Sequence, residues 1–375
     1  MFKLPDIPLS IFSKMSQLSA AHGAINLSQG FPDFDVDPML IDIIKETASK
    51  KVHQYCPMSG LPELLQETAK LIDNTYGRKL NHNKEILITA GATQGIFTSI
   101  QALIEPGDEV LILDPSYDCY CMPITLSQGI PVRIPLNKEF LPDWGLIQKK
   151  TTNKTKLIIT NNPHNPSGRS WTESDMLELS NLLNSWKHLY HLSDEVYEHI
   201  TFENTHLSAN LYPALHSKTI IVSSFGKTFH ITGWKVGYVV APEAIMNEIK
   251  KVHQYLVFTV NSISQHALAQ YLKSQDVKKL GPFYQKKRDL FRSGLKESRF
   301  DLLPCEGTYF QLASFDKISA LDDTSFCEDL VTKFKLAAIP VSVFSAHKEE
   351  KKVVRFCFAK EDETLINATK ILCEI

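Results

Sequence analysis

Long apolar runs and an excess of charge of either sign are both missing from this 375-residue sequence. The longest apolar runs have the length of a strand, such as Val236–Ala241, and fall far short of the roughly 20 residues that span a bilayer. Pro5, Asp6 and Pro8 interrupt the N-terminus, so we expect no secretory signal peptide. A formal net charge of -2 gives no electrostatic reason to propose a nucleic acid or an anionic membrane as partner.

Cysteines at metal-site spacing are missing as well. The seven cysteines are an odd number scattered along the chain, and Cys119 and Cys121 have no second pair at zinc-finger spacing. We interpret them as reduced thiols and expect a soluble, cytoplasmic protein without a metal site. No Gly-x-Gly-x-x-Gly follows a strand, and no lysine stands in the Walker position after Gly91, which argues against a dinucleotide fold and a P-loop.

What is present is an ordinary globular composition, with 43% hydrophobic and 22% charged residues. Apolar strand-like segments alternate with helical ones between residues 86 and 241, which predicts an α/β domain on a mostly parallel, buried sheet. The strand-like segments are 86–90, 110–113, 157–160, 191–193, 219–222 and 236–240.

The chain is long enough for a large core and a second lobe. Beyond about residue 281, a basic helical run is followed by strand-like segments at 307–312 and 353–358, which predicts a smaller α+β lobe. We divide the chain into an N-terminal arm that adds to the small domain (1–45), a large domain (46–280) and a small C-terminal domain (281–375).

Nearly every strand of the large domain ends in a short polar or Gly/Pro-rich segment, where open α/β sheets bind their ligands. Lys227 follows the strand at 219–222, and a lysine in a partly desolvated site has a lowered pKa and can form a Schiff base. Ser224 in the same turn can donate to a phosphate, and Lys235 can supply a positive charge to it. An isolated lysine of this kind is usually just solvated, so Lys227 alone identifies nothing.

Polar residues after two other strands suit the same ring-shaped ligand. Asp194 can pair with a pyridinium nitrogen, and Tyr197 can hydrogen-bond the phenolic oxygen of that ring. Asn165 lies in a loop that two prolines and a glycine make rigid, although the sequence does not show whether the Asn-Pro bonds are cis. Taken singly, these residues also fit a surface acid, a half-buried tyrosine and a plain turn.

Three further positions point to anion binding and stacking. Residues 91–93 lie between a strand and a helix, where free backbone N–H groups favour a phosphate. Tyr117 follows the next strand and can stack on a flat ring, although it also fits a core position. Arg355 lies in an apolar run, where a buried guanidinium requires a partner. A substrate carboxylate and a structural Asp or Glu fit that requirement equally well.

Together these residues resemble the class I and II aminotransferases of pyridoxal-phosphate (PLP) fold type I, the aspartate aminotransferase-like fold with a mostly parallel central sheet and a smaller α+β lobe. The resemblance runs from about residue 20 to the C-terminus. Its motifs are Gly30–Asp33, Gln54–Tyr55, Asn162–Gly168, Ser193–Tyr197, Ser223–Thr228 and Gly233–Gly237. Segments 54–60, 114–118, 251–256, 304–310 and 340–344 are similar to the bacterial methionine aminotransferase branch, which is close to the kynurenine aminotransferases.

The resemblance implies a role for each candidate residue. Lys227 would carry PLP and then move a proton between the substrate Cα and the cofactor C4′. Arg355, with Asn165 and the Gly30 backbone, would bind the substrate α-carboxylate. The other cofactor contacts would come from Asp194 at the ring nitrogen, Tyr197 and Asn165 at the phenolic oxygen, Tyr117 on the ring face, and Ala92, Thr93, Ser224 and Lys235 at the phosphate. Tyr55 would reach the phosphate of the neighbouring subunit, so a homodimer is implied.

Two positions depart from the family pattern without removing a phosphate contact. Ala92-Thr93 stands where a tyrosine is common in the kynurenine enzymes. Lys235 stands where many relatives have arginine, and it keeps the charge but not the forked geometry.

The expected reaction moves the amino group of methionine, and of phenylalanine, tyrosine, tryptophan or kynurenine, to a 2-oxo acid in two half-reactions with ping-pong kinetics. Tyr55, Tyr117 and Phe258 are the apolar candidates for side-chain recognition, and no second arginine is placed for a side-chain carboxylate. A C–S β-lyase acting on cystathionine or cysteine S-conjugates uses the same fold and lysine and stays open as an alternative. A PLP-sensing domain of a transcription regulator would require a DNA-binding region first, and the motif at Gly30 comes too early for one.

Overall fold

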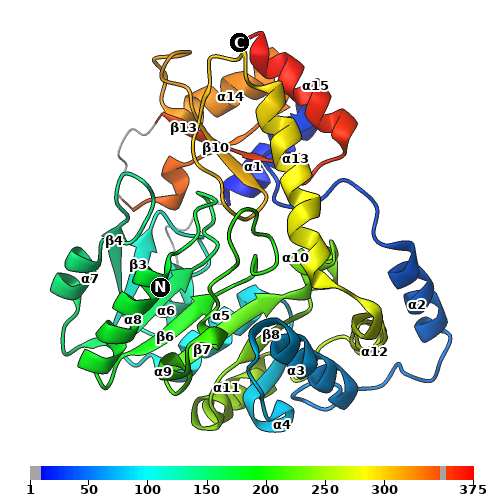
Figure 1. Cartoon of the computed structure of the whole chain (residues 1–375), viewed down its shortest axis with the longest axis vertical. Coiled ribbons are helices and arrows are strands. Elements are labelled where there is room, and N and C mark those ends of the chain that lie inside the picture. The colour runs from blue at the N-terminus through cyan, green and yellow to red at the C-terminus, as the bar shows by residue number, and fades with distance from the viewer. Residues whose placement is uncertain (1–9, 347–351) are drawn as a thin grey trace, which may run out of the picture.

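The computed structural model describes residues 10–346 and 352–375, so the interrupted segment with Pro5, Asp6 and Pro8 lies outside the described residues. A seven-stranded sheet with the order β2-β8-β7-β6-β5-β3-β4 forms its centre. Its strands are β2 (Ile86–Thr89), β3 (Glu109–Asp114), β4 (Ile130–Pro135), β5 (Thr155–Asn161), β6 (Tyr190–Asp194), β7 (Thr219–Ser224) and β8 (Gly237–Val240). Figure 1 shows this sheet in the lower half of the molecule.

All strands of the central sheet run in one direction except β8, which is antiparallel to both β2 and β7. Strands β2 and β7 are buried along their whole length, as expected of a sheet covered on both faces. The prediction of a mostly parallel, buried sheet is therefore confirmed, with each predicted strand in place. The edge strand β4 was not predicted, because Pro131 and Pro135 mask its strand pattern, and proline is tolerated only at a sheet edge.

Alternate residues along the strands feed two separate cores, one on each face of the sheet. In β3, Leu111 and Leu113 join the core under α3 (Pro62–Tyr76), α8 (Glu173–Ser185) and α12 (Ser262–Tyr271). Val110 and Ile112 join the opposite core, under α5 (Ala92–Leu103) and α11 (Glu243–Leu256). This period of two is what a strand buried on both faces requires.

A third core surrounds the four-stranded antiparallel sheet β12-β13-β10-β9. Its strands are β9 (Asp301–Leu302), β10 (Phe310–Ser314), β12 (Ile339–Pro340) and β13 (Val353–Cys357), so β10 begins three residues later than the predicted strand at 307–312. The covering helices are α1 (Ile11–His22), α13 (Leu280–Gly294), α14 (Asp323–Phe334) and α15 (Asp362–Cys373). Figure 1 shows the N-terminal helix α1 beside these C-terminal elements.

The N-terminal segment joins the two halves of the molecule. After α1, the strand β1 (Ile25–Asn26) pairs with β11 (Leu336–Ala337), and the chain then runs to α2 (Pro38–Ala48), which packs on α12 beside the central sheet. The exact division at residues 45 and 280 stays a proposal. The remaining α-helices are α4 (His82–Glu85), α6 (Cys121–Leu126), α7 (Trp144–Lys150), α9 (Pro213–His216) and α10 (Phe225–Thr228). Among the described helices, none has the length and apolarity that crossing a bilayer would take.

Gly237, at the start of β8, provides a test of how tightly the central sheet is packed. A Cβ on it would lie 2.6 Å from the Ser223 carbonyl oxygen and 3.0 Å from the Ala92 backbone nitrogen. We expect Gly237→Ala to lower the free energy of unfolding by about 1–3 kcal/mol, because the obstructing atoms are backbone. Gly233→Ala is the matched control, since nothing lies within 4 Å of its Cβ position. Equal denaturant midpoints for the two variants would contradict this packing.

Candidate active site

A cavity of about 330 Å³ lies between the carboxyl ends of the strands of the central sheet and the antiparallel sheet. Every parallel strand from β5 to β7 sends residues into it, and Phe310 and Arg355 enter from β10 and β13. The predicted site residues that line it are Gly30, Ala92, Thr93, Tyr117, Asn165, Asp194, Tyr197, Ser224, Lys227, Lys235 and Arg355. One cavity therefore collects every predicted site residue except Tyr55 and Phe258.

Lys227 lies in α10, one turn after the end of β7, and is largely buried. Its Nζ donates to the Tyr309 hydroxyl oxygen at 2.8 Å and to the Gly30 carbonyl oxygen at 3.1 Å. Burial lowers the pKa of Lys227 to about 8, because the charged ammonium loses its hydration. A neutral amine is thus readily available for nucleophilic attack or for accepting a proton.

Asp194 ends β6 and is buried at the cavity wall. Burial raises the pKa of its carboxyl to about 6, although the hydrogen bond from the Tyr120 hydroxyl, at 2.6 Å, favours the charged form. The group is an anion near neutral pH and can pair with a protonated ring nitrogen. Sequence reasoning missed Tyr120. Its position three residues after Tyr117 does not indicate that its hydroxyl contacts Asp194, which lies on another strand.

Arg355 in β13 is the most deeply buried cation of the cavity, at 1% exposed. It donates to Asn165 Oδ1 at 2.6 Å and to the Ser28 carbonyl oxygen at 3.3 Å, and its guanidinium carbon lies 3.8 Å from the centre of the Phe310 ring. Within the described residues no carboxylate forms an ion pair with it, and its Nε has no partner. The guanidinium is thus suited to an anionic ligand rather than to a structural Asp or Glu.

An anion-binding corner lies at the start of α5. Gly91 caps this helix with φ 78° and offers no side-chain acceptor, so the first N–H groups of the helix stay free to bind an anion. Lys235 stands beside this turn, with its Nζ 3.2 Å from the point that a Gly91 Cβ would occupy. Ser224 accepts a hydrogen bond from the Gly226 N–H at 3.2 Å, which leaves its own hydroxyl proton for a ligand.

Two aromatic residues and an amide complete the wall. Burial raises the pKa of the Tyr197 hydroxyl well above its ordinary value, so this group stays a neutral donor. The Asn165 backbone N–H donates to Asn161 Oδ1 at 2.7 Å, and the Asn162-Pro163 and Asn165-Pro166 bonds are both cis. Tyr117 also lines the cavity, with its ring centre 6.5 Å from that of Phe12, a lining residue that sequence reasoning missed.

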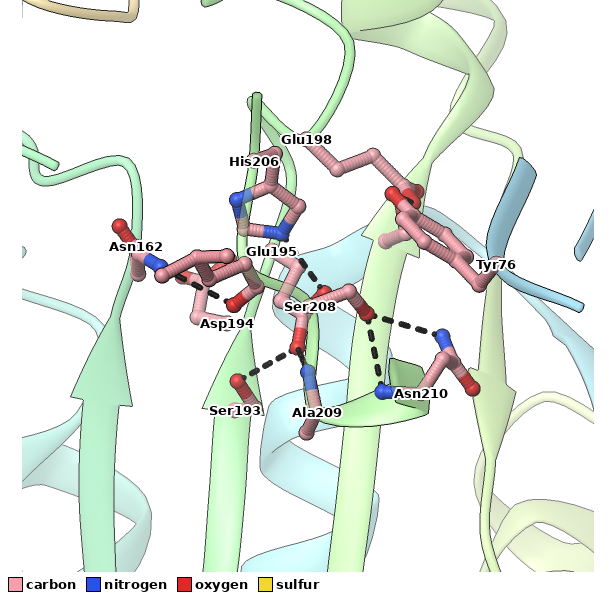
Figure 2. A network of polar contacts seen from close by, with 12 residues as sticks. Tyr76, Asn162, Ser193, Asp194, Glu195, Glu198, His206, Ser208, Ala209 and Asn210 are labelled. Atoms are coloured by element: carbon pink, nitrogen blue, oxygen red, sulfur yellow. Dashed lines mark hydrogen bonds and ion pairs between the residues drawn. The ribbon is translucent and has the colours of Figure 1, made fainter. Parts of the chain in front are cut away.

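A buried polar network lies next to Asp194 and includes Glu195 and Glu198 (Figure 2). Glu195 accepts hydrogen bonds from Ser193 Oγ at 2.8 Å, from the Ala209 N–H at 3.0 Å and from His206 Nε2 at 2.9 Å. Glu198 accepts hydrogen bonds from the hydroxyls of Tyr76 at 2.5 Å, Tyr238 at 2.6 Å and Ser223. The two glutamates alternate with the site residues Asp194 and Tyr197 along the chain, so their donors fix the orientation of this segment.

Tyr55 and Phe258 are the predicted residues that a single chain does not bring to the cavity. The Tyr55 side chain is 81% exposed and contacts the Phe258 ring edge-to-face, with ring centres 5.4 Å apart. In one chain neither residue lines the cavity, and their roles in cofactor binding and side-chain recognition stay predictions.

Comparison with known proteins places this geometry in a family. The family model "Aminotransferase class I and II" matches residues 22–372. Methionine aminotransferase of Escherichia coli K12 is 44% identical over 100% of this chain and 97% of its own. Kynurenine–oxoglutarate transaminase of Dictyostelium discoideum is 33% identical over 96% of this chain and 92% of its own.

A solved structure agrees with these relatives. E. coli YbdL, for which a methionine aminotransferase function has been identified, superposes with a TM-score of 0.98 at 43% identity, over 100% of this chain and 99% of YbdL. The predictions of the aminotransferase fold and of an aminotransferase are thereby confirmed. The chain therefore belongs to the class I and II aminotransferases, enzymes that transfer the amino group of an amino acid to a 2-oxo acid.

Proposed function

We propose that this chain binds PLP through Lys227 and transfers the amino group of methionine, and of aromatic amino acids, to a 2-oxo acid. The observation that carries the proposal is the meeting in one cavity of a lysine with a lowered pKa, the buried Asp194 carboxylate and a buried arginine that has no carboxylate partner among the described residues. The similarity to the methionine aminotransferase of E. coli supports methionine as a donor.

The cavity residues fit PLP group by group. This cofactor has an aldehyde that needs an amine, a ring nitrogen that needs a carboxylate, a phenolic oxygen that needs donors and a phosphate that needs an anion site. The lining offers Lys227 for the first, Asp194 for the second, Tyr197 and Asn165 for the third, and Ala92, Thr93, Ser224 and Lys235 for the fourth. Tyr117 also lines the cavity, and its aromatic ring is proposed to stack on the ring of the cofactor.

When bound, PLP withdraws the electrons left at the substrate Cα after its proton departs. Arg355 and Asn165 bind the α-carboxylate and so fix the Cα near Lys227. Once free of the cofactor aldehyde, the Nζ of Lys227 would accept the Cα proton and donate it again, and the second 2-oxo acid would follow the same steps in reverse. A pKa of about 8 suits this exchange, because both forms of the amine are accessible near neutral pH.

The lining favours amino acids with uncharged side chains. Among the described lining residues, Arg355 is the one arginine, and the lysines Lys227 and Lys235 already have roles at the cofactor. Phe12, Tyr117 and Phe310 present aromatic surface instead. A thioether or an aromatic ring gains contact there, whereas a second carboxylate would be buried without a partner.

The enzyme is proposed to be a homodimer that completes each site with Tyr55 of the other subunit. Tyr55 and Phe258 are exposed and in contact, and Tyr255 and Leu256, just before Phe258 in the chain, are exposed as well, Tyr255 to 87%. Exposed aromatic residues that cluster in this way are typical of a protein interface. A second copy of the chain would bury these residues and bring Tyr55 to its neighbour's phosphate site.

We further propose a cytoplasmic location, on the basis of the thiols. All seven cysteines are unpaired, and four of them are buried. Free thiols in this number suit a reducing compartment.

A panel of amino donors against several 2-oxo acids tests the function. We expect the purified enzyme to form 2-oxo acid from methionine and phenylalanine faster than from aspartate or glutamate, and to release no thiol from cystathionine. Ammonia and free thiol from cystathionine, without transamination of methionine, would instead identify a C–S β-lyase.

In the same assay Lys227→Ala should be inactive and should retain no PLP after borohydride reduction. Lys218→Ala is the matched control, because Lys218 also has a lowered pKa but lies outside the cavity.

Removing the Arg355 guanidinium should weaken amino acid binding. Loss of one partner from a buried charged contact costs about 2–5 kcal/mol, so Arg355→Ala should raise KM for the amino donor by roughly 30-fold or more. The absorbance of the bound cofactor should persist. Arg292→Ala is the control, since Arg292 bonds Leu303 and Gln311 outside the cavity. An unchanged KM would remove Arg355 from the substrate site.

Mixing two inactive variants tests the shared site. A dimer of one Lys227→Ala subunit and one Tyr55→Ala subunit has one doubly altered site and one intact site, provided that Tyr55 acts across the interface. Subunit exchange at equal concentrations should therefore restore roughly a quarter of the wild-type sites. If Tyr55 acts within its own subunit, or if the protein is a monomer by light scattering, no activity returns.

A further inference from the structure

Tyr309 contacts the amine of Lys227, although it is not one of the residues that line the cavity. It immediately precedes β10 and is fully buried, with its ring 5.2 Å from that of Tyr197 and nearly perpendicular to it. The mechanism proposed above gives it no role. Its hydroxyl is nevertheless one of two oxygens that hold the Lys227 nitrogen.

The direction of each hydrogen bond follows from the proton count. The Tyr309 hydroxyl has one proton and donates it to the Gly30 carbonyl oxygen at 2.6 Å. Its oxygen therefore accepts from Lys227 Nζ at 2.8 Å, and the Gly30 oxygen accepts a second N–H of the same amine at 3.1 Å. Burial raises the pKa of Tyr309 well above its ordinary value, so the hydroxyl keeps its proton.

These contacts leave one direction open at the nitrogen. A neutral amine has two N–H groups and one lone pair, and both N–H groups are held on the side of Tyr309 and Gly30. We infer that Tyr309, with the Gly30 carbonyl, docks the free amine of Lys227 so that its lone pair faces the cavity, which makes Tyr309 a positioning residue for proton transfer. The inference rests on the proposed function, in which Lys227 accepts the Cα proton.

The proton balance of the step agrees with this geometry. The proton from Cα adds to the open position of Nζ and makes an ammonium, whose other two N–H groups keep their bonds to Tyr309 and Gly30. The same proton then leaves from the same position, so neither Tyr309 nor Gly30 gains or loses one. The rings of Tyr197 and Tyr309, with centres 5.6 Å and 5.4 Å from Nζ, favour the ammonium while it exists.

Tyr309→Phe removes the hydroxyl and keeps the ring, so it tests the docking directly. We expect kcat to fall by about 10- to 100-fold, because a small misplacement of a reacting group has this effect on rate. KM for the amino donor should stay nearly unchanged, since Arg355 is untouched. Tyr284→Phe is the matched control: Tyr284 is equally buried, its ring centre lies 5.6 Å from that of Tyr309, and its hydroxyl has no partner among the described residues.

A second measurement reads the amine without the cofactor. Full-length protein stripped of PLP is labelled with acetic anhydride over a pH series, and acetylation of Lys227 is followed by mass spectrometry. The Tyr309 oxygen stabilises the ammonium, so its loss should lower the pKa of Lys227 and make the lysine more reactive at neutral pH while kcat falls. The titratable groups that act on Lys227 from the surrounding elements are Asp194, Tyr197, Lys235, Tyr309, Arg355 and Cys357, and only Tyr309 changes.

The outcomes separate the inference from the function on which it rests. If Tyr309→Phe has the same labelling profile and the same kcat as Tyr284→Phe, the docking is overturned. A fall in kcat with an unchanged labelling profile would also overturn it, because that pattern indicates general damage to the enzyme. If the wild-type enzyme transaminates no donor, the proposed function fails, and the labelling profile still decides whether Tyr309 holds the amine.

Discussion

Burial of two cations at the junction between the central sheet and the antiparallel sheet is the constraint on which the rest of the site depends. A buried charge is unfavourable unless polar groups replace its water. One short N-terminal stretch supplies such groups to both cations: the Ser28 carbonyl accepts from Arg355, and the Gly30 carbonyl accepts from Lys227. Lys227 follows a strand of the central sheet and Arg355 lies in the antiparallel sheet, so this stretch, which belongs to neither sheet, links the two cations of the cavity.

Between residues 194 and 198, side chains that face the cavity alternate with side chains that face away from it. This arrangement shows how the end of a central strand holds a buried anion. Asp194 and Tyr197 face the cavity, whereas Glu195 and Glu198 face the network behind them. Each glutamate is held by three donors, and these donors come from elements as distant as α3 and β8. The segment is thus clamped on one side, which leaves the groups on its other side free for a ligand.

The central sheet and most of the site could be predicted from the sequence, for the same reason. Parallel strands buried on both faces read as short apolar runs, and polar residues directly after such runs must meet at one edge of the sheet. Lys227, Asp194 and Asn165 were found in this way. The edge strand β4 was not, because its prolines resemble a turn. Tyr120 and Tyr309 were missed because each is one aromatic residue among many, and its hydroxyl acquires a role only from a partner far away in the chain.

The single antiparallel strand of the central sheet has a consequence for how the site can vary. Because β8 is antiparallel to its neighbours, the first residue of β8 pairs with the last residue of β7. The start of β8 therefore lies at the edge of the sheet that faces the cavity. Lys227 and Lys235 therefore occupy the same short hairpin connection, one on the helical turn after β7 and the other just before β8. The length of that connection sets the separation between the Lys227 and Lys235 side chains. An insertion elsewhere around the cavity would leave the spacing between Lys227 and Lys235 unchanged. One residue added between β7 and β8 would change that spacing, even if every strand kept its register.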